Sequence, residues 1–239
     1  MSENATEKSC VVVPAYQEQG RIGSVVVEIR KHGADVVVVD DGSTDLTAEE
    51  ARKAGAVVIR HEANKGKGAA LATGFEYARS HGVGVVITMD ADGQHAPSDL
   101  PAFLEAYRGT GCPVIVGNRM GTTGAMPLIR RLTNRYMSWL LSRRIGQHVP
   151  DTQCGFRLFR TDVIPALSGA STRFAAESEI LIELGDRGVR SGAVPIQVIY
   201  GDEKSKINPL RDTIRFFKML RRHRNRREKR KDGDHGTTD

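Results

Sequence analysis

The sequence predicts an α/β fold in which a mostly parallel sheet is flanked by helices. Short valine-rich runs that do not alternate with polar residues recur along the chain, and such runs are typical of strands buried on both faces. A helix-like stretch follows each of the first four runs, and alternating strands and helices favour parallel pairing. With 239 residues, the chain has the length of one α/β domain with additions.

In chain order, the expected strands cover 10–16, 35–41, 56–60, 83–90 and 113–119. The helices expected between them cover 21–33, 45–54, 67–81 and 97–108. Asp45 is a candidate N-cap of the second helix, because its carboxylate can accept a free amide of the first turn. Pro97 and Ser98 are typical of a helix start and open the fourth helix.

After Arg119 the regular alternation ends. Residues 127–145 predict a helix in which apolar and aromatic side chains are interleaved with arginines. We expect a turn-rich DTQCGFRLF at 151–159, a helix at 174–187, a strand at 193–200 and an amphipathic helix from about 208. The expected organisation is a flexible N-terminus at 1–9, one domain at 10–220 and a basic, disordered tail at 221–239.

Composition argues against several classes of protein. No apolar run approaches the roughly 20 residues of a membrane-spanning helix, and the polar N-terminus is unlike a secretory signal, so we expect a cytoplasmic protein. Cys10, Cys112 and Cys154 form no CxxC pair and are interpreted as reduced thiols. The net charge of +6 reflects an excess of basic residues concentrated in 211–231. Within it, the basic run 221–231 lacks interleaved aromatic residues and any nucleic-acid-binding motif, so we expect no nucleic-acid partner.

The stretch TMDADGQH ends an expected strand with two aspartates one residue apart. Asp90 and Asp92 can share a hard divalent cation whose other ligands are phosphate oxygens, and Gln94 can add a neutral oxygen. Mg²⁺ or Mn²⁺ fits such a donor set. The alternative is a capped turn, because Asp and Gly after a strand are common turn formers.

Two further polar clusters follow expected strands, where ligands collect in parallel sheets. In DDGSTD, Asp40 can accept from a ribose hydroxyl or a base N–H, while Ser43, Thr44 and Asp45 can also serve as helix caps. The NKGKGAAL segment lacks P-loop spacing, which argues against an ATPase, although its glycines allow a ligand close to the backbone. Lys65 or Lys67 is either a phosphate contact or a solvated surface charge.

Seven segments together carry a resemblance to a known family. In order, they are VVVPAYQE, DDGSTD, NKGKGAAL, DADGQHAP, GNR, DTQCGFRLF and YGDEKSKIN. The set resembles the family-two glycosyltransferases of GT-A fold, in particular the dolichol-phosphate mannosyltransferase and polyprenyl-phosphate glycosyltransferase branch. The resemblance covers about residues 9–220 and implies a GT-A-like, Rossmann-related sheet.

The resemblance also implies roles for individual positions. The expected metal ligands are Asp90, Asp92 and Gln94. The expected substrate-binding residues are Pro14, Tyr16, Glu18, Asp40, Asp41, Lys67, Asp90, Arg119, Arg131, Arg135, Asp151, Gln153, Arg157, Ser205 and Lys206. The expected catalytic residues are Asp92, Arg119, Glu179 and Lys206. Gln17 replaces the family's usual asparagine, and FAAESE leaves open whether Glu177 or Glu179 serves as the acidic residue of the family's FxxE pattern.

The implied reaction is metal-dependent, inverting transfer of a hexose from GDP-mannose or UDP-glucose to a polyprenyl phosphate. The alternatives are transfer to a soluble or protein-bound hydroxyl, with Glu179 or Asp151 as base, and an inactive sugar-nucleotide or lipid-phosphate binding protein. The arginine-rich helix at 127–145 and the segment from 208 are typical of helices that lie on anionic membranes. We therefore expect peripheral attachment to a cytoplasmic membrane face, with a membrane-protein partner possible.

Overall fold

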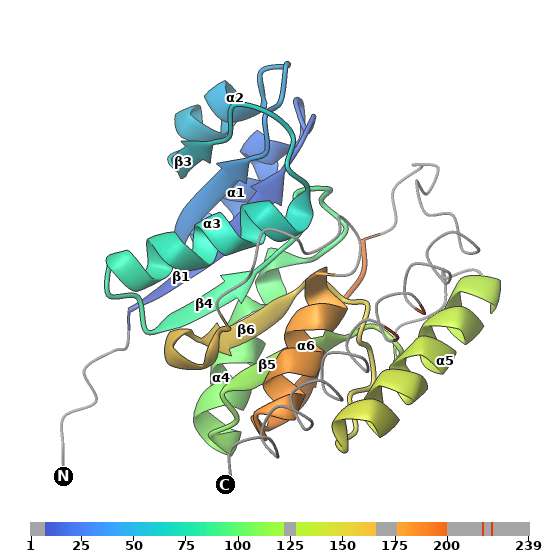
Figure 1. Ribbon diagram of the computed structural model, residues 1–239. Coiled ribbons are helices and arrows are strands. Elements are labelled where there is room, and N and C mark those ends of the chain that lie inside the picture. The colour runs from blue at the N-terminus through green and yellow to red at the C-terminus, as the bar shows by residue number, and fades with distance from the viewer. Residues whose placement is uncertain (1–7, 122–127, 166–175, 200–216, 218–220, 222–239) are drawn as a thin grey trace, which may run out of the picture. The chain divides into compact units, whose positions relative to one another are not determined.

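The computed structural model describes residues 8–121, 128–165 and 176–199, together with Phe217 and Arg221 (Figure 1). The chain divides into two compact units, Met1–Glu203 and Lys204–Asp239, and all the elements below belong to the first unit. Ser205, Lys206, the expected domain boundary at 220 and the tail after Arg221 lie outside the described residues. Of the expected helix from about 208, the structure describes Phe217 and Arg221, and both are helical.

Seven strands form one mixed sheet in the order β3-β2-β1-β4-β6-β5-β7. Their bounds are Ser9–Ala15 (β1), Asp35–Asp40 (β2), Val57–Arg60 (β3), Val85–Thr88 (β4), Val114–Asn118 (β5), Arg157–Arg160 (β6) and Ser191–Pro195 (β7). Neighbouring strands from β3 to β4 are parallel, as are β5 and β7, whereas β6 is antiparallel to both β4 and β5. The predicted parallel sheet is confirmed, and β6 lies where the sequence predicted a turn-rich segment.

The described helices match the expected ones to within a few residues. They are Ile22–Lys31 (α1), Thr47–Lys53 (α2), Lys67–Ser80 (α3), Leu100–Thr110 (α4), Leu128–Ile145 (α5) and Ala176–Asp186 (α6), with short 3-10 turns at Pro97–Asp99 (η1) and Thr161–Val163 (η3). The predicted N-cap at Asp45 is wrong, because Leu46 occupies the N-cap position of α2. The Asp45 carboxylate instead accepts the Thr47 amide at 3.0 Å, in a turn that precedes the helix.

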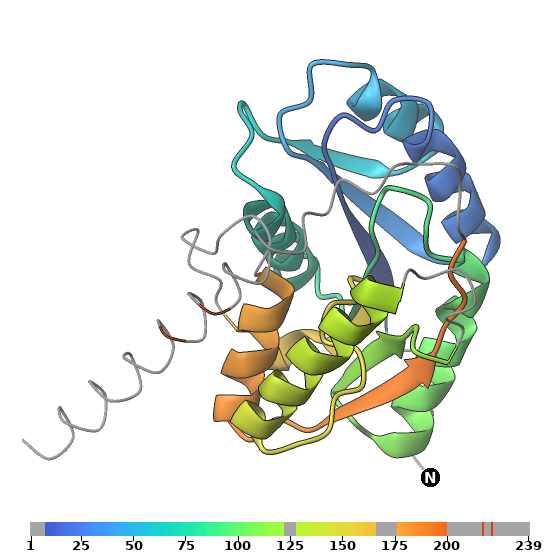
Figure 2. The same ribbon diagram turned by 90° about the vertical axis from the view of Figure 1, so that its right-hand side faces the viewer.

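The helices cover the sheet in two layers. On one face, α1 packs on β2 and on α2, and α4 packs on β5, β6 and β7. On the other face, α3 packs on β1, β2 and β4, while α6 contacts both α3 and α5. Figure 2 separates these layers, with α3 and α6 on one side of the strands and α1 and α4 on the other. Both faces of the central strands are therefore buried, as their valine-rich sequences require.

The core follows from these sequences. Val11, Val12 and Val13 of β1 have no exposed surface, and Gly74 allows α3 to approach β1 because a Cβ there would overlap Val12. Cys10 and Cys154 are buried, and burial raises the pKa of each thiol to about 12. No helix in the described part of the chain is both long enough and apolar enough to cross a bilayer.

Candidate active site

The polar clusters predicted from the sequence meet at one edge of the sheet. β1, β2, β4 and β5 run in the same direction, so the loops that follow them emerge at the same edge. Because β6 runs in the opposite direction, the loop that precedes it, 151–156, emerges at this edge as well. The ends of β3 and β7, which are parallel to β2 and β5, lie at this edge too, so it combines the ends of six strands with the beginning of β6.

Side chains after β2 hold the loop after β1 in place. The Ser43 hydroxyl accepts the Gln17 amide at 3.0 Å, and the Thr47 hydroxyl accepts the Glu18 amide at 2.9 Å. Gln17 has a φ of 57°, an uncommon backbone conformation for a residue other than glycine. Ser43 and Thr47 thus fix the path of the first loop, a role that the cap interpretation of DDGSTD did not foresee.

Asp40 and Asp41 lie side by side in the chain but have different surroundings. Asp40 is fully buried: Oδ1 accepts the Ser43 amide at 3.0 Å, while Oδ2 lies 3.2 Å from Nε of Arg60 without hydrogen-bond geometry. Asp41 accepts the amides of Lys65 and Gly66 at 2.9 and 2.7 Å. Asp41 therefore orders the loop that leads into α3.

A third partner of Asp41 is a histidine that the sequence analysis did not single out. Nδ1 of His61 lies 2.7 Å from the Asp41 carboxylate, and Nε2 lies 2.9 Å from the Thr73 hydroxyl on α3. Its sequence signal was weak, because a lone histidine after the short strand β3 belongs to none of the seven segments. The remaining predicted nucleotide contacts lie at the end of β1 and on the loop after it: Pro14 is buried, Glu18 is half-buried and Tyr16 is exposed.

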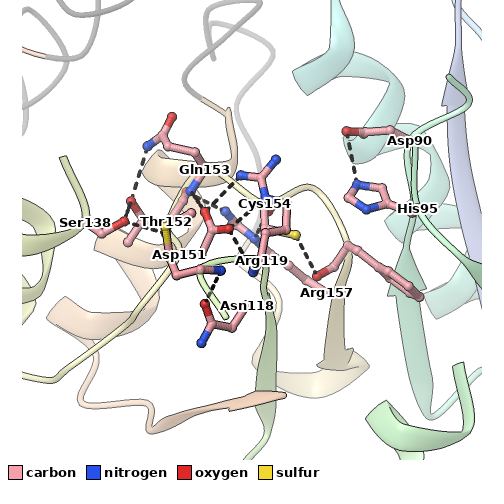
Figure 3. Close-up of polar contacts among 12 residues, drawn as sticks. Asp90, His95, Asn118, Arg119, Ser138, Asp151, Thr152, Gln153, Cys154 and Arg157 are labelled. Atoms are coloured by element: carbon pink, nitrogen blue, oxygen red, sulfur yellow. Dashed lines mark hydrogen bonds and ion pairs between the residues drawn. The ribbon is translucent and has the colours of Figure 1, made fainter. Parts of the chain in front are cut away.

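Asp90 lies in a cluster of charged side chains from three elements. Nζ of Lys67, the first residue of α3, contacts Oδ1 of Asp90 at 2.5 Å and also contacts Oε1 of Glu177, in the first turn of α6. His95 approaches Asp90 from the other side, with Nε2 3.7 Å from Oδ2 (Figure 3). Burial raises the pKa of Asp90, but the Lys67 and His95 interactions outweigh it and hold that pKa well below its ordinary value.

The same cluster includes Glu177, one of the two candidate acidic residues of the FAAESE segment. The carboxylate of Glu177 contacts Nζ of Lys67, which also contacts Asp90. Burial lowers the pKa of Lys67, and the charges of Asp90 and Glu177 raise it above its ordinary value overall. The ammonium therefore stays charged between its carboxylate partners.

The donor set after β4 fits a hard cation. The Lys67 ammonium, which is itself a cation, already contacts Asp90. Gly155 leaves space beside the Asp90 carboxylate, because a Cβ at position 155 would lie 2.6 Å from Oδ2 of Asp90. Asp92 accepts the Gln94 amide at 3.0 Å, so the turn interpretation holds for this side chain as well. Among the described residues, no three His, Cys, Asp or Glu side chains are grouped closely enough to hold a metal ion. Further ligands would have to come from Gln94, water or a diphosphate.

Arg119 and Asp151 form a buried ion pair. Nε and Nη2 of Arg119 donate to the two carboxylate oxygens of Asp151 at 2.7 and 2.9 Å (Figure 3). Burial lowers the pKa of Arg119, but the hydrogen bonds and charge of Asp151 raise it overall. Asp151 is fully buried and paired, which argues against a role for it as a general base.

Arg157 is fully buried and holds the loop before β6. Its guanidinium donates to the carbonyl oxygens of Thr152, Cys154 and Glu177 at 2.8, 2.7 and 2.5 Å. With no exposed surface, Arg157 would influence a substrate through this loop rather than by direct contact. Gln153 is half-buried, and its amide group reaches the Ser178 hydroxyl at 3.2 Å. Figure 3 shows how these side chains gather around the Arg119–Asp151 pair.

The other expected contacts lie on α5 or outside the described part of the chain. Arg131 is half-buried and Arg135 is exposed. Ser205 and Lys206 are among the residues whose structure is not described. Ile199, the last described residue before them, donates its amide hydrogen to the Gln94 carbonyl at 2.9 Å. His95, part of the DADGQHAP segment, was not assigned a role, although its position in that segment was a usable signal.

Relatives of this chain transfer sugars to lipid phosphates. It is 32% identical over 213 residues to the UDP-N-acetylglucosamine–dolichyl-phosphate N-acetylglucosaminyltransferase of Methanococcus voltae, covering 80% of this chain and 85% of that protein. It is 33% identical over 213 residues to the dolichyl-phosphate hexose transferase of Haloferax volcanii, covering 87% of this chain and 90% of that protein.

Solved structures and a family model complete the comparison. Glucosyl-3-phosphoglycerate synthase of Mycobacterium tuberculosis, solved with Mg²⁺ and UDP, superposes with a TM-score of 0.65 at 23% identity, covering 84% of this chain and 73% of that one. This similarity confirms the GT-A-like fold. The model of "Glycosyl transferase family 2" matches residues 10–167. The chain therefore belongs to glycosyl transferase family 2 and is a glycosyltransferase.

Proposed function

We propose that this chain transfers a hexose from a nucleotide-diphosphate sugar to a polyprenyl phosphate. The observation that carries the proposal is the charged cluster after β4, where Asp90 meets Lys67 at the same edge as the buried Arg119–Asp151 pair. Carboxylates and cations at one site suit a reaction in which one phosphate group leaves and another attacks. The lipid nature of the acceptor is supported by the names of the two archaeal relatives.

The donor would bind across the loops after β1 and β2. Tyr16 and Glu18 lie on the first loop and Pro14 at the end of β1, while Asp40 offers an Oδ2 atom that has no hydrogen-bond partner among the described residues. A buried acceptor atom of this kind suits a base N–H or a ribose hydroxyl. Asp41 would act through the loop that it orders, and Lys67 would contact the phosphates. GDP-mannose and UDP-glucose are the donors to test first.

Asp90, Asp92 and Gln94 would hold Mg²⁺ or Mn²⁺ against the diphosphate of the donor. A bound divalent ion supplies positive charge that stabilises the departing nucleoside diphosphate. The fit rests on the hard oxygen donors and on the space that Gly155 leaves beside Asp90. Lys206, which lies outside the described residues, is the candidate basic residue that the YGDEKSKIN segment would contribute.

The acceptor phosphate would lie near α5 and the loop before β6. Arg131 and Arg135 are the candidate contacts for it. Arg119 and Gln153 would shape the adjoining part of the site. Because a phosphate oxygen is already ionised at neutral pH, the acceptor needs no strong base, and direct displacement would invert the anomeric carbon. A hydroxyl acceptor would need a base, for which Glu179 is the candidate, because Asp151 is held in a buried ion pair with Arg119.

A membrane surface would supply the lipid acceptor, and α5 is suited to contact it. Met137, Ser138 and Leu141 form the buried face of α5. The opposite face exposes the large side chains Leu128, Ile129, Leu132, Tyr136 and Trp139. The helix carries arginines and no acidic residue, and Arg143 lies over the Trp139 ring at 5.4 Å from its centroid. Apolar and basic side chains on one exposed face fit an anionic membrane.

Transfer itself can be measured with radiolabelled GDP- and UDP-sugars, a polyprenyl phosphate and Mg²⁺ or Mn²⁺, scored as label in the organic phase. We expect lipid-linked product and its loss in Asp92→Ala. Asp35→Ala is the matched control, because Asp35 is exposed at the start of β2, at the opposite edge of the sheet. Full turnover of Asp92→Ala would refute the metal assignment, and transfer to soluble acceptors alone would refute the lipid acceptor.

Membrane contact has its own readout, because Trp139 is the chain's single tryptophan and lies on α5. We expect a blue shift of its emission with anionic vesicles and none with neutral ones. Leu132→Ser should weaken vesicle binding, whereas Leu46→Ser, which alters a leucine of similar exposure just before α2, should not. An unchanged emission spectrum would refute contact through α5. Deletion of 221–239 tests the tail separately.

A further inference from the structure

We infer that Lys67 is the resident cation of the unloaded metal site: its ammonium occupies Asp90 until a divalent ion arrives, and Glu177 then retains it. This inference rests on the metal assignment proposed above for Asp90. Its geometric basis is the double contact of Nζ, which touches Oδ1 of Asp90 and Oε1 of Glu177.

The carboxylates that compensate the charge of Lys67 come from outside its own helix. Lys67 is the first residue of α3, where the helix dipole disfavours a positive charge. No acidic residue of the first turn of α3 compensates for it. The compensating carboxylates come instead from β4 and α6, and the pair contacts are half-buried, with side-chain exposures of 29% for Lys67, 27% for Asp90 and 15% for Glu177. Partial burial keeps these attractions from being fully screened by salt.

A divalent ion and this ammonium cannot both bind Asp90 tightly at the same time. The ammonium contacts Oδ1, and the two cations would repel each other at such short range. Glu177 offers an alternative that needs no backbone movement, since Lys67 already contacts its carboxylate. Lys67 would therefore release Asp90 and keep Glu177 as the metal enters.

This exchange should couple the binding of the metal to the binding of the donor. When metal binds without a donor, it must displace the ammonium from Asp90. The two charges of the ion and the single charge of Lys67 then lie close together beside Asp90 and its neighbours. A donor diphosphate brings negative charge that both the metal and Lys67 can share. Metal and nucleotide should therefore bind cooperatively, each raising the affinity for the other by the same factor.

The test is the affinity of the donor-free protein for Mn²⁺, measured from the electron paramagnetic resonance signal of free Mn²⁺. Lys67→Met removes the resident cation, and we expect Mn²⁺ to bind about tenfold more tightly or better. Lys67→Gln repeats the test with a polar side chain in case the Met variant folds poorly. Lys65→Met is the control: it removes the same charge from an exposed side chain of the loop that leads into α3 and should leave the Mn²⁺ affinity unaltered.

Two further variants separate the possible results. Glu177→Gln removes the alternative partner, so Lys67 should remain on Asp90 and Mn²⁺ should bind more weakly than in the parent. Asp90→Asn tests the metal site itself: if it leaves Mn²⁺ affinity unaltered, the proposed metal site is wrong. If Asp90→Asn abolishes binding while both Lys67 variants bind Mn²⁺ no more tightly than the parent, the metal site stands and the resident-cation role is refuted. A purely structural role for Lys67 predicts that second result.

Discussion

The edge of the sheet that carries the candidate active site has two sides, and different kinds of interaction hold each side together. On the β1–β2 side, hydroxyls and carboxylates accept backbone amides, as Thr47 does from Glu18 and Asp41 does from Gly66. On the β6 side, buried guanidinium groups do this work, through the Arg119–Asp151 pair and the three carbonyls bound by Arg157. The β6 side therefore depends on buried charge, and the loss of one partner should cost more there than on the β1–β2 side.

The largest expected effect is that of Asp151→Asn. The substitution keeps the shape of the side chain but leaves the buried Arg119 cation without its counterion. We expect the free energy of unfolding, measured by urea denaturation, to fall by about 3–5 kcal/mol. Asp162→Asn breaks an exposed pair with Arg160 and should cost at most about 1 kcal/mol. Equal losses in the two variants would show that burial does not distinguish these pairs.

The next largest effect is expected for Arg157→Met. This change removes the donor to three carbonyls of the loop before β6 and of α6. Unsatisfied buried acceptors should lower the free energy of unfolding by about 3 kcal/mol in urea. Arg187→Met is the control, because Arg187 pairs with Glu183 at the surface, and it should stay within about 0.5 kcal/mol of the parent. A loss for Arg157→Met no greater than the control's would contradict the supporting role of this guanidinium.

A smaller effect is expected on the β1–β2 side, from Thr47→Val. The variant keeps the shape of the side chain and removes the acceptor of the Glu18 amide. The free energy of unfolding should fall by about 1 kcal/mol, and the Glu18 amide should exchange its hydrogen faster than in the parent. If Thr47→Val were as costly as Asp151→Asn, the contrast between the two sides would be lost.

The smallest effect concerns reactivity rather than stability. Because burial raises the pKa of Cys10 and Cys154 to about 12, these thiols should be almost fully protonated at pH 8. A thiol reagent at that pH should label Cys112, which is half-buried, and spare the other two until the protein unfolds. Rapid labelling of Cys154 in the native protein would mean that the loop before β6 opens readily, contrary to its dense hydrogen bonding.

The sequence predicted the β1–β2 side better than the β6 side. Valine-rich strands and the helices after them follow from local patterns, and β1, β2 and β4 were found within a few residues of their ends. The strand β6 was missed because RLFR is short and carries two arginines, so it lacks the apolar run of a buried strand. Arg157 is buried only because carbonyls from Thr152, Cys154 and Glu177 converge on it, which no local pattern reveals.

The site was predicted as a set of positions rather than as a set of contacts. The DxD carboxylates and Lys67 were identified from their segments, but the contact between Lys67 and Glu177 depends on the packing of α3 against α6. The same holds for His61, whose partners Asp41 and Thr73 lie on other elements. Pairings of this kind arise from tertiary structure, and local sequence patterns do not reveal them.

The reversed direction of β6 constrains how the protein can be re-engineered. Because β6 hydrogen-bonds with β4 and β5 along its length, shifting its register by one residue would turn Arg157 toward the opposite face of the sheet. Changes of length between Asp151 and Arg157 therefore threaten the strand as well as the loop. Specificity should be more safely grafted by exchanging β6 together with its preceding loop as one cassette than by lengthening or shortening that loop in place.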